Sequence, residues 1–180
     1  WSLKMKVKLS QAVKVFFGNS SLEMVYFEAI ANAIDADATE ITISINLVDK
    51  SKLKNLTISI KDNGIGFTNE RYRKFSNLFD VEEASHKGLG RLVYIAYFQE
   101  IKVASYFNNN QKREFTFSDN FDGDNQTIEQ TEEHVSETLI TMNNYTLQKL
   151  AKNNYINPIY LKQKILEEFY SLLFKKKTNK

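Results

Sequence analysis

Residues 22–35 carry two kinds of side chain, and each kind recurs at the spacing of one helix face. Ser20 and Glu23 are three residues apart, as in a capping box, and predict that a helix begins about here. The apolar residues recur every three or four positions and predict one buried side, formed by Leu22, Val25, Tyr26, Ala29, Ile30 and Ala33.

The second stripe of this helix is polar. Glu28, Asn32 and Asp35 follow one another at i, i+4 and i+7, which places them on one side of the helix. Their neighbours are small or apolar, whereas a solvated face usually carries Lys, Arg and more Glu. The stripe is therefore either an unusual exposed face or a functional one, and the rest of the chain must decide between them.

The composition excludes several kinds of site. A chain of 180 residues suits one domain with a substantial core. It has no cysteine, which excludes a thiol nucleophile, a thiolate zinc site and a disulfide framework, and which fits a reducing cytoplasm. The net charge of +2 lacks the clustered basic excess of a dedicated nucleic-acid binder, and no apolar run reaches the ~18 residues that span a bilayer. Trp1 in place of an initiator Met suggests a fragment of a longer protein.

Alternating apolar and polar residues predict a sheet. Residues 40–47 and 56–60 alternate around a polar loop, which predicts an antiparallel hairpin. Further strands are predicted over 3–9, 100–107, 114–118 and 135–142, and helices over 11–17, 69–79, 92–98 and beyond Pro158.

Two glycine-containing segments stand at the ends of predicted elements. Asp62-Asn63-Gly64-Ile65-Gly66 follows the strand over 56–60 and is either a plain turn or a set of functional groups held by a rigid strand. Residues 82–91 lead into the apolar helix that begins at Leu92. Free N–H groups and the helix dipole favour an anion at such a helix start, although a short Gly-x-Gly is more often a simple loop.

Three motifs therefore follow in order: Glu28 and Asn32 on a helix, residues 62–66 after a strand, and Lys87-Gly88-Leu89-Gly90-Arg91 before a helix. This order resembles the GHKL ATPase superfamily, which comprises gyrase-type topoisomerase subunits, heat-shock chaperones of the ninety-kilodalton class, sensor histidine kinases and MutL, with the MORC proteins as relatives. The resemblance covers about residues 20–142.

The resemblance implies a role for each of these residues. Glu28 would be the general base that polarises the attacking water, and Asn32 would ligate the magnesium ion that bridges the phosphates. Asp62 would accept a hydrogen bond from the adenine amino group, while Gly64 and Gly66 let the base pack against backbone. A mobile lid over about 68–90 would end in the residues that line the phosphates, namely Lys87, Gly88, Leu89, Gly90 and Arg91.

One more residue matches the family's pattern. Thr138 resembles the family's late threonine beside the adenine-binding aspartate, although Glu137 stands where the family usually has glycine.

Two observations bear on the family's branches. Glu28 favours hydrolysis, because histidine kinases generally lack a Glu at this position. The string Asp-Ala-Asp-Ala-Thr over 35–39 resembles MutL, MORC and the chaperones more than a kinase. Asp35 itself is expected to support the helix end by hydrogen bonding or capping at least as much as to contact a ligand.

The resemblance implies an α/β (α+β) two-layer sandwich with a mixed, mainly antiparallel sheet and helices on one face, the Bergerat ATP-binding fold. We expect one ATP-binding domain over 1–180, with C-terminal helices over about 145–175. Its implied function is ATP binding and slow magnesium-dependent hydrolysis, which drives a conformational change of a larger protein.

The implied cofactors are ATP and Mg. The expected partners are ATP or ADP, a second copy of the full-length chain in a nucleotide-dependent homodimer, and a DNA or protein client bound through regions outside this sequence. We expect no membrane partner and a cytoplasmic location. A kinase-type phosphotransfer domain and a non-catalytic nucleotide-sensing module remain alternatives.

Overall fold

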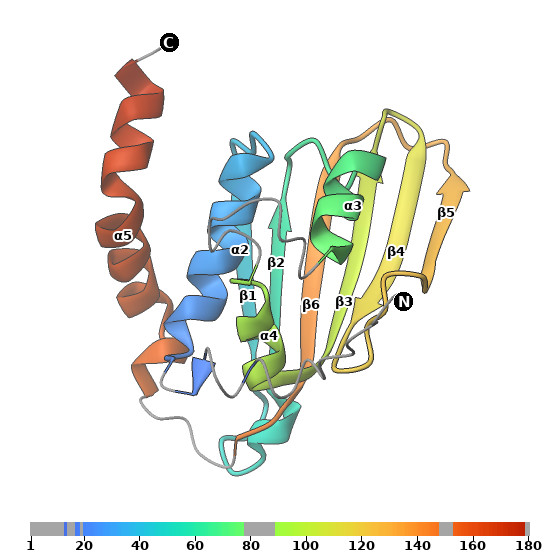
Figure 1. Ribbon diagram of the computed structural model, residues 1–180. Coiled ribbons are helices and arrows are strands. Elements are labelled where there is room, and N and C mark those ends of the chain that lie inside the picture. Colours follow the sequence, from blue (N-terminus) through green and yellow to red (C-terminus); the bar gives the residue numbers. More distant parts are fainter. Residues whose placement is uncertain (1–12, 14–16, 19, 78–88, 148–152, 179–180) are drawn as a thin grey trace, which may run out of the picture.

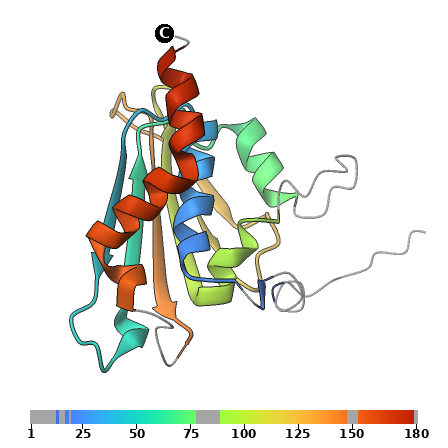
Figure 2. The same ribbon diagram turned by 90° about the vertical axis from the view of Figure 1, so that its left-hand side faces the viewer.

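The computed structural model describes residues 13, 17–18, 20–77, 89–147 and 153–178. These residues form two layers, a sheet and a set of helices packed on one of its faces (Figures 1 and 2). The predicted strand over 3–9 and most of the predicted helix over 11–17 lie outside the described residues.

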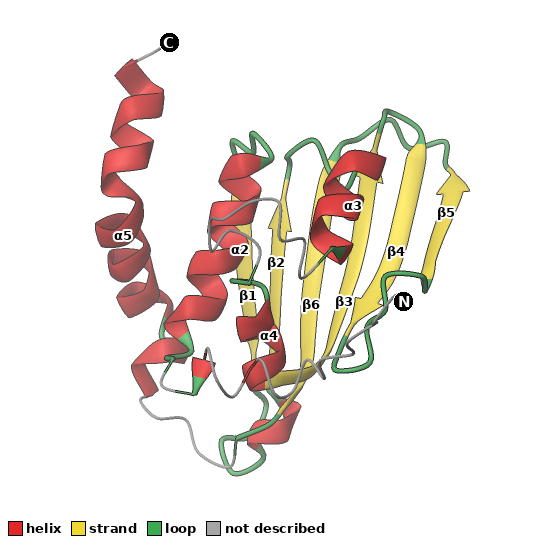
Figure 3. Cartoon of the chain, viewed as in Figure 1, coloured by secondary structure: helices red, strands yellow, loops and turns green. Residues whose placement is uncertain are grey.

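The sheet has six described strands in the order β1-β2-β6-β3-β4-β5 (Figure 3). Every pairing among them is antiparallel, whereas a mixed, mainly antiparallel sheet was expected. The predicted two-layer fold is confirmed. Strand β6 comes last along the chain but lies between β2 and β3. The strands are β1 (Ile41–Asn46), β2 (Thr57–Asp62), β3 (Phe98–Phe107), β4 (Gln111–Phe117), β5 (Gln126–Gln130) and β6 (Glu137–Tyr145).

Twelve of the buried side chains of the sheet form three rows, each running across β2, β6, β3 and β4. Two rows are apolar and the third is polar, and no member of any row is more than 7% exposed. Alternation along each strand puts these residues on one face, and the register of the ladders aligns them from strand to strand. The rows are Ile58–Met142–Ile101–Phe117, Ile60–Ile140–Val103–Phe115 and Asp62–Thr138–Ser105–Arg113.

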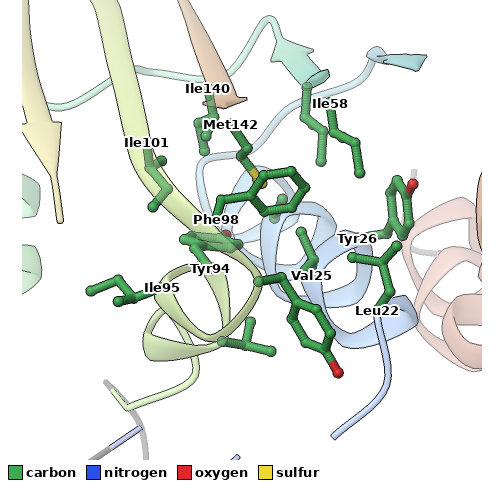
Figure 4. Close-up of a cluster of buried hydrophobic side chains, with 14 of the residues drawn as sticks. Leu22, Val25, Tyr26, Ile58, Tyr94, Ile95, Phe98, Ile101, Ile140 and Met142 are labelled. Carbon is green, nitrogen blue, oxygen red and sulfur yellow. The ribbon is translucent and has the colours of Figure 1, made fainter. Parts of the chain in front are cut away.

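Helices cover this face of the sheet (Figures 1 and 3). They are α2 (Glu23–Asp35), α3 (Asn69–Ser76) and α4 (Leu92–Tyr97). Helix α5 (Pro158–Thr178) packs against α2 beside the β1 edge of the sheet (Figure 1), and short 3-10 helices lie at Leu53–Asn55 and Asn153–Ile156. The apolar stripe predicted on α2 is buried, as expected. Figure 4 shows Leu22, Val25 and Tyr26 of this stripe in one cluster with Phe98 of β3 and Met142 of β6.

The predicted capping box at the start of α2 is wrong. The helix begins at Glu23, close to the expected position, but no side chain caps it. The Ser20 hydroxyl donates instead to the Phe17 carbonyl oxygen at 2.8 Å, and Tyr97 of α4 donates its hydroxyl to the Ser20 carbonyl at 2.6 Å. The Ser20 N–H also donates to the Phe17 carbonyl, so both groups that the capping box would have used bond to the preceding turn instead.

The C-terminal helices were expected to begin at about residue 145, and the structure differs there. Strand β6 continues to Tyr145, and α5 begins at Pro158, whose fixed φ suits a first helical position. The aromatic face predicted for this helix packs on α2, where the rings of Phe169 and Phe27 meet edge to face at 6.0 Å. Tyr26 of α2 also donates its hydroxyl to the Tyr155 carbonyl at 2.9 Å.

Strand β5 was not predicted. Its sequence, Gln-Thr-Ile-Glu-Gln, lacks alternation, and four of its five residues are exposed. An edge strand of this kind forms through its backbone ladder with β4 rather than through a buried face, so its side chains carry little signal. Within the described residues, no helix combines the length and the hydropathy that crossing a bilayer requires.

We predict that Phe117→Ala lowers the free energy of unfolding by about 3–5 kcal/mol, because the variant leaves a cavity in the first apolar row. Phe117 is 0% exposed and contacts the rings of Phe75 and Phe121 edge to face. Ile128→Ala on β5, where the side chain is 47% exposed, is the control and should change stability by less than about 0.5 kcal/mol. Urea titration measures both, and equal effects would contradict the packing described.

Candidate functional site

Glu28 and Asn32, the first two residues of the polar stripe on α2, face α4. The Asn32 amide nitrogen donates to the Glu28 carboxylate at 3.1 Å and lies 3.5 Å from the Tyr94 hydroxyl of α4. Neither contact uses the Asn32 amide oxygen. Asp35, one turn further on, is exposed, and its backbone carbonyl accepts a hydrogen bond from Arg71. The stripe therefore divides into two residues that face a neighbouring helix and one at the helix end.

The Glu28 carboxylate is in a poorly solvated place. Burial raises its pKa above the ordinary value, while the hydrogen bond from Asn32 and the positive charge of Arg91 lower it, and the charge of Asp35 raises it. The net direction is upward. A carboxyl group with this balance takes up a proton more readily than a solvated one, which is a property expected of a general base.

Gly90, at the start of α4, lies against the same carboxylate. A Cβ atom built on Gly90 would overlap the Glu28 carboxylate group, so any larger residue here would displace that side chain. Gly90 also accepts the backbone N–H of Val93 in the first turn of α4. The structure thus brings together two residues that the sequence placed in different motifs.

Leu89 and Arg91 flank this glycine in different ways. Leu89 packs against the hydrophobic core, and its carbonyl accepts the N–H of Leu92. Lys87 and Gly88, the other two residues predicted to line phosphates, lie outside the described residues.

Arg91 is buried beside the Glu28 carboxylate. Its guanidinium donates to the carbonyl oxygens of Lys74 and Asn77 at the end of α3, and it stacks on the Phe75 ring at 4.9 Å. Burial lowers the pKa of Arg91 to about 10, although the negative charge of Glu28 opposes that shift. Arg91 therefore supplies positive charge next to Glu28 while it fastens α3 to α4.

The second part of the site is the end of β2. The Asp62 carboxylate is 7% exposed and accepts the backbone N–H of Gly64 at 2.9 Å. Burial raises the pKa of Asp62, although the Gly64 hydrogen bond and the charge of Arg71 act in the opposite direction. Thr138 lies opposite Asp62 in the β2–β6 ladder, so the predicted pair is brought together.

The backbone that follows Asp62 is held close to β3. Gly66 has a φ of 76°, a conformation that favours glycine, and a Cβ atom there would overlap the Tyr106 carbonyl oxygen. The next residue, Phe67, donates its backbone N–H to the Ser105 hydroxyl at 2.8 Å. Ser105 in turn lies 3.0 Å from the Thr138 hydroxyl, so one network joins the glycine segment to β3 and β6.

Asn63 and Glu137 take structural places at this end of the sheet. The Asn63 side-chain oxygen accepts the backbone N–H groups of Thr39 and Glu40 at 2.9 Å each, which fixes the turn after α2. The Glu137 carboxylate pairs with Lys61 at 2.8 Å, while Thr138 next to it is buried with the polar row. Glu137 therefore engages the neighbouring strand β2.

A cavity connects the two parts of the site. Its volume is about 30 Å³, and its lining includes Asn32, Asp62, Gly66, Arg71, Tyr94 and Thr138. Arg71 reaches from α3 to α2, where it donates to the carbonyl oxygens of Asn32 and Asp35 at 3.2 and 3.0 Å. A volume of this size is about that of one water molecule.

The described residues include no group of three or more His, Asp or Glu side chains that could hold a metal ion by themselves. The Asn32 amide oxygen, which neither of its described contacts uses, is a hard donor of a type that magnesium accepts when waters and substrate phosphates supply its other ligands.

Sequence reasoning missed four side chains of this region: Arg71, Tyr94, Ser105 and Arg113. Tyr94 and Ser105 have hydroxyl groups in otherwise apolar segments, which is a weak signal in the sequence. Arg113 is 1% exposed although it belongs to a charged segment, Gln-Lys-Arg-Glu. Only the strand order reveals its burial, because β3 and α3 cover it from different parts of the chain.

Comparison with known proteins identifies the class of this fold and site. Residues 20–155 match the family model described as histidine kinase-, DNA gyrase B-, and HSP90-like ATPase. The chain therefore belongs to this family of GHKL-type ATPase domains, which confirms the predicted superfamily. The nearer resemblance to the MutL, MORC and chaperone branch stays a prediction. No curated protein matches the chain with significance.

Solved structures share the fold. The 43K ATPase domain of Thermus thermophilus gyrase B, solved with an aminocoumarin, matches with a TM-score of 0.57 and 17% identity over 87% of this chain and 44% of its own. The ATPase region of Saccharomyces cerevisiae topoisomerase II matches with a TM-score of 0.51 and 17% identity over 78% of this chain and 42% of its own. The chain thus spans less than half the length of each.

We predict that the stability of Glu28→Gln relative to wild type increases as pH rises from about 4 to about 8. Because the pKa of Glu28 is raised in the folded state, the folded protein binds this proton more tightly than the unfolded chain, and wild type loses stability as pH rises through the raised pKa. The neutral glutamine avoids that loss. Urea unfolding of both proteins across this range measures the difference.

Glu70→Gln is the control for this prediction. Lys74 lowers the pKa of Glu70, so its stabilising charge is lost on substitution and the pH dependence has the opposite sign. A Glu28→Gln difference that does not change with pH would contradict the raised pKa.

Proposed function

We propose that this chain is the nucleotide-binding part of a larger protein, and that it binds ATP with magnesium and hydrolyses it slowly. The observation that carries the proposal is the contact between Glu28 and Gly90, because it sets a carboxylate of raised pKa at the glycine-rich start of a helix. Membership of the GHKL-type family supports the choice of ATP.

Each residue has a proposed role in this reaction. Glu28 orients the attacking water and takes its proton, and Asn32 holds Glu28 through its amide nitrogen while its amide oxygen serves as the magnesium ligand. Bound ATP and magnesium supply the electrophilic γ-phosphoryl group and offset its charge. Arg91 adds positive charge beside Glu28, and the backbone around Gly90, with Lys87, Gly88 and Leu89, lines the phosphates.

The end of β2 is the proposed base-reading part. Asp62 is a buried acceptor for the adenine amino group, and its other contact, from the Gly64 N–H, fixes its orientation. Gly64 and Gly66 keep backbone rather than side chain against the base, and Thr138 adds a hydroxyl beside Asp62. Together these groups favour adenine over guanine, which presents a carbonyl at the corresponding position.

The proposed product of the cycle is a conformational change. Arg71 and Phe75 of α3 line the cavity between the two parts of the site, so a bound nucleotide would contact the start of the expected lid. We propose that nucleotide binding closes this lid, over about 68–90, and promotes dimerisation of the full-length protein. A DNA or protein client, a cytoplasmic location and the MutL, MORC or chaperone branch belong to the same proposal.

We predict that Glu28→Ala keeps its affinity for ATP but hydrolyses it at least about 100-fold more slowly, because a general base typically contributes a factor of this size. Calorimetry measures binding, and release of phosphate from γ-labelled ATP measures turnover. Unchanged turnover in the variant would exclude the general base. Label transferred to protein with no free phosphate would favour a phosphotransfer domain instead, and binding without turnover in wild type would favour a nucleotide sensor.

We predict that Asp62→Asn weakens ATP binding about 10- to 100-fold, because hydrogen bonds to charged groups are worth about 1.5–3 kcal/mol. In the variant, the amide oxygen should keep the hydrogen bond from the Gly64 N–H. The amide NH2 group then faces the adenine amino group, so that two donors meet. Asp49→Asn, in the loop between β1 and β2, is the control and should bind ATP as wild type does. Unaltered affinity of Asp62→Asn by calorimetry would contradict the adenine role.

A further inference from the structure

The third row of the sheet is a buried polar unit. Five polar or charged residues are buried in the described part of the chain, and four of them form this row: Asp62, Thr138, Ser105 and Arg113. The first two belong to the proposed base-reading part. The other two, Ser105 and Arg113, were not expected from the sequence and still need an explanation, because burying polar groups costs free energy unless they are hydrogen-bonded.

Ser105 and Arg113 are direct partners in the β3–β4 ladder, and both bond to Phe67. The Phe67 N–H donates to the Ser105 hydroxyl at 2.8 Å, and the Phe67 carbonyl accepts from Arg113 at 2.6 Å. Arg113 also donates to the Thr68 carbonyl at 2.8 Å and to the Asn69 side-chain oxygen. The backbone just after Gly66 is therefore held at both of its polar groups by two adjacent strands.

The surroundings of Arg113 suit a side chain that holds the backbone after Gly66. Its guanidinium lies over the rings of Tyr72 and Phe107 at 4.7 and 4.8 Å, and its described hydrogen bonds all go to the segment Phe67–Asn69. No described carboxylate forms an ion pair with it. The planar fork of arginine can meet several acceptors at once, which a lysine ammonium does less well.

We propose that Ser105 and Arg113 are positioning residues for nucleotide binding. They hold Phe67–Asn69 against β3 and β4, and thereby keep Gly66, Gly64 and the Asp62 carboxylate in the arrangement that receives the base. The inference rests on the proposed function, and it deepens that function by adding two residues that do not touch the ligand.

Ser105→Ala tests this positioning role. Loss of the hydroxyl leaves the Phe67 N–H without its acceptor, so the segment occupies its binding arrangement for a smaller fraction of the time and the apparent affinity falls by that fraction. We expect about tenfold weaker binding of ATP, ADP and adenosine alike, since the cost of one unsatisfied buried donor corresponds to about that factor. Arg113→Lys, which keeps the charge but not the fork, should show the same equal loss for all three ligands.

Ser59→Ala is the matched control. Ser59 lies on β2 and contacts the Thr141 hydroxyl across the ladder at 3.5 Å, much as Ser105 contacts Thr138, but it lies outside the polar row. We expect unchanged affinities for this variant. Hydrogen exchange of the nucleotide-free proteins provides the second readout, with faster exchange over residues 65–72 in Ser105→Ala and Arg113→Lys than in Ser59→Ala.

The outcomes separate the two proposals. If wild type binds ATP while Ser105→Ala and Arg113→Lys, both folded by circular dichroism, bind all three ligands with wild-type affinity, the positioning role is overturned and the proposed function stands. A loss confined to ATP and ADP, with adenosine unaffected, also overturns it, because the effect would then lie at the phosphates. If wild type binds none of the three ligands, the proposed function fails, and this inference fails with it.

Discussion

The pairing of β6 with β2 on one side and β3 on the other is the interaction on which the rest of the site depends. It aligns Asp62, Thr138 and Ser105 in one row and continues through the β3–β4 ladder to Arg113. A shift of one residue in any ladder would turn these polar side chains to the opposite face and expose the apolar rows beside them. The two apolar rows therefore stabilise the register, and the register places the polar row.

The other half of the site depends on helix packing. Because Gly90 has no side chain, the start of α4 lies directly against α2. Gly90 contacts the Glu28 carboxylate, and the Tyr94 hydroxyl lies near the Asn32 amide. Burying Glu28 and Asp62 raises the pKa of both carboxyl groups, which lowers the stability of the fold at neutral pH. Groups with shifted pKa values are common at functional sites.

Local sequence patterns predicted the structure correctly where the buried positions recur at a regular spacing. The apolar stripe of α2, the hairpin of β1 and β2, and the helix after Gly90 were all predicted from spacing, and the stripe of Glu28 and Asn32 was recognised as unusual. The capping role of Ser20 failed because the helix has its N-cap at Leu22, two residues later, and the Ser20 hydroxyl and N–H both bond to the Phe17 carbonyl. Strand β5 was missed because a ladder on one side forms it and its side chains remain exposed.

The sequence by itself determined the family and the order of the motifs, and it indicated the candidate residues for the chemistry, because these depend on residue type and local spacing. Only the tertiary structure decided which motifs meet. It set Gly90 against Glu28, and it turned Ser105 and Arg113, unremarkable in a strand pattern, into the groups that hold the backbone after Gly66. The physical reason is that strand order and register are set by long-range hydrogen bonds and burial, which no local pattern encodes.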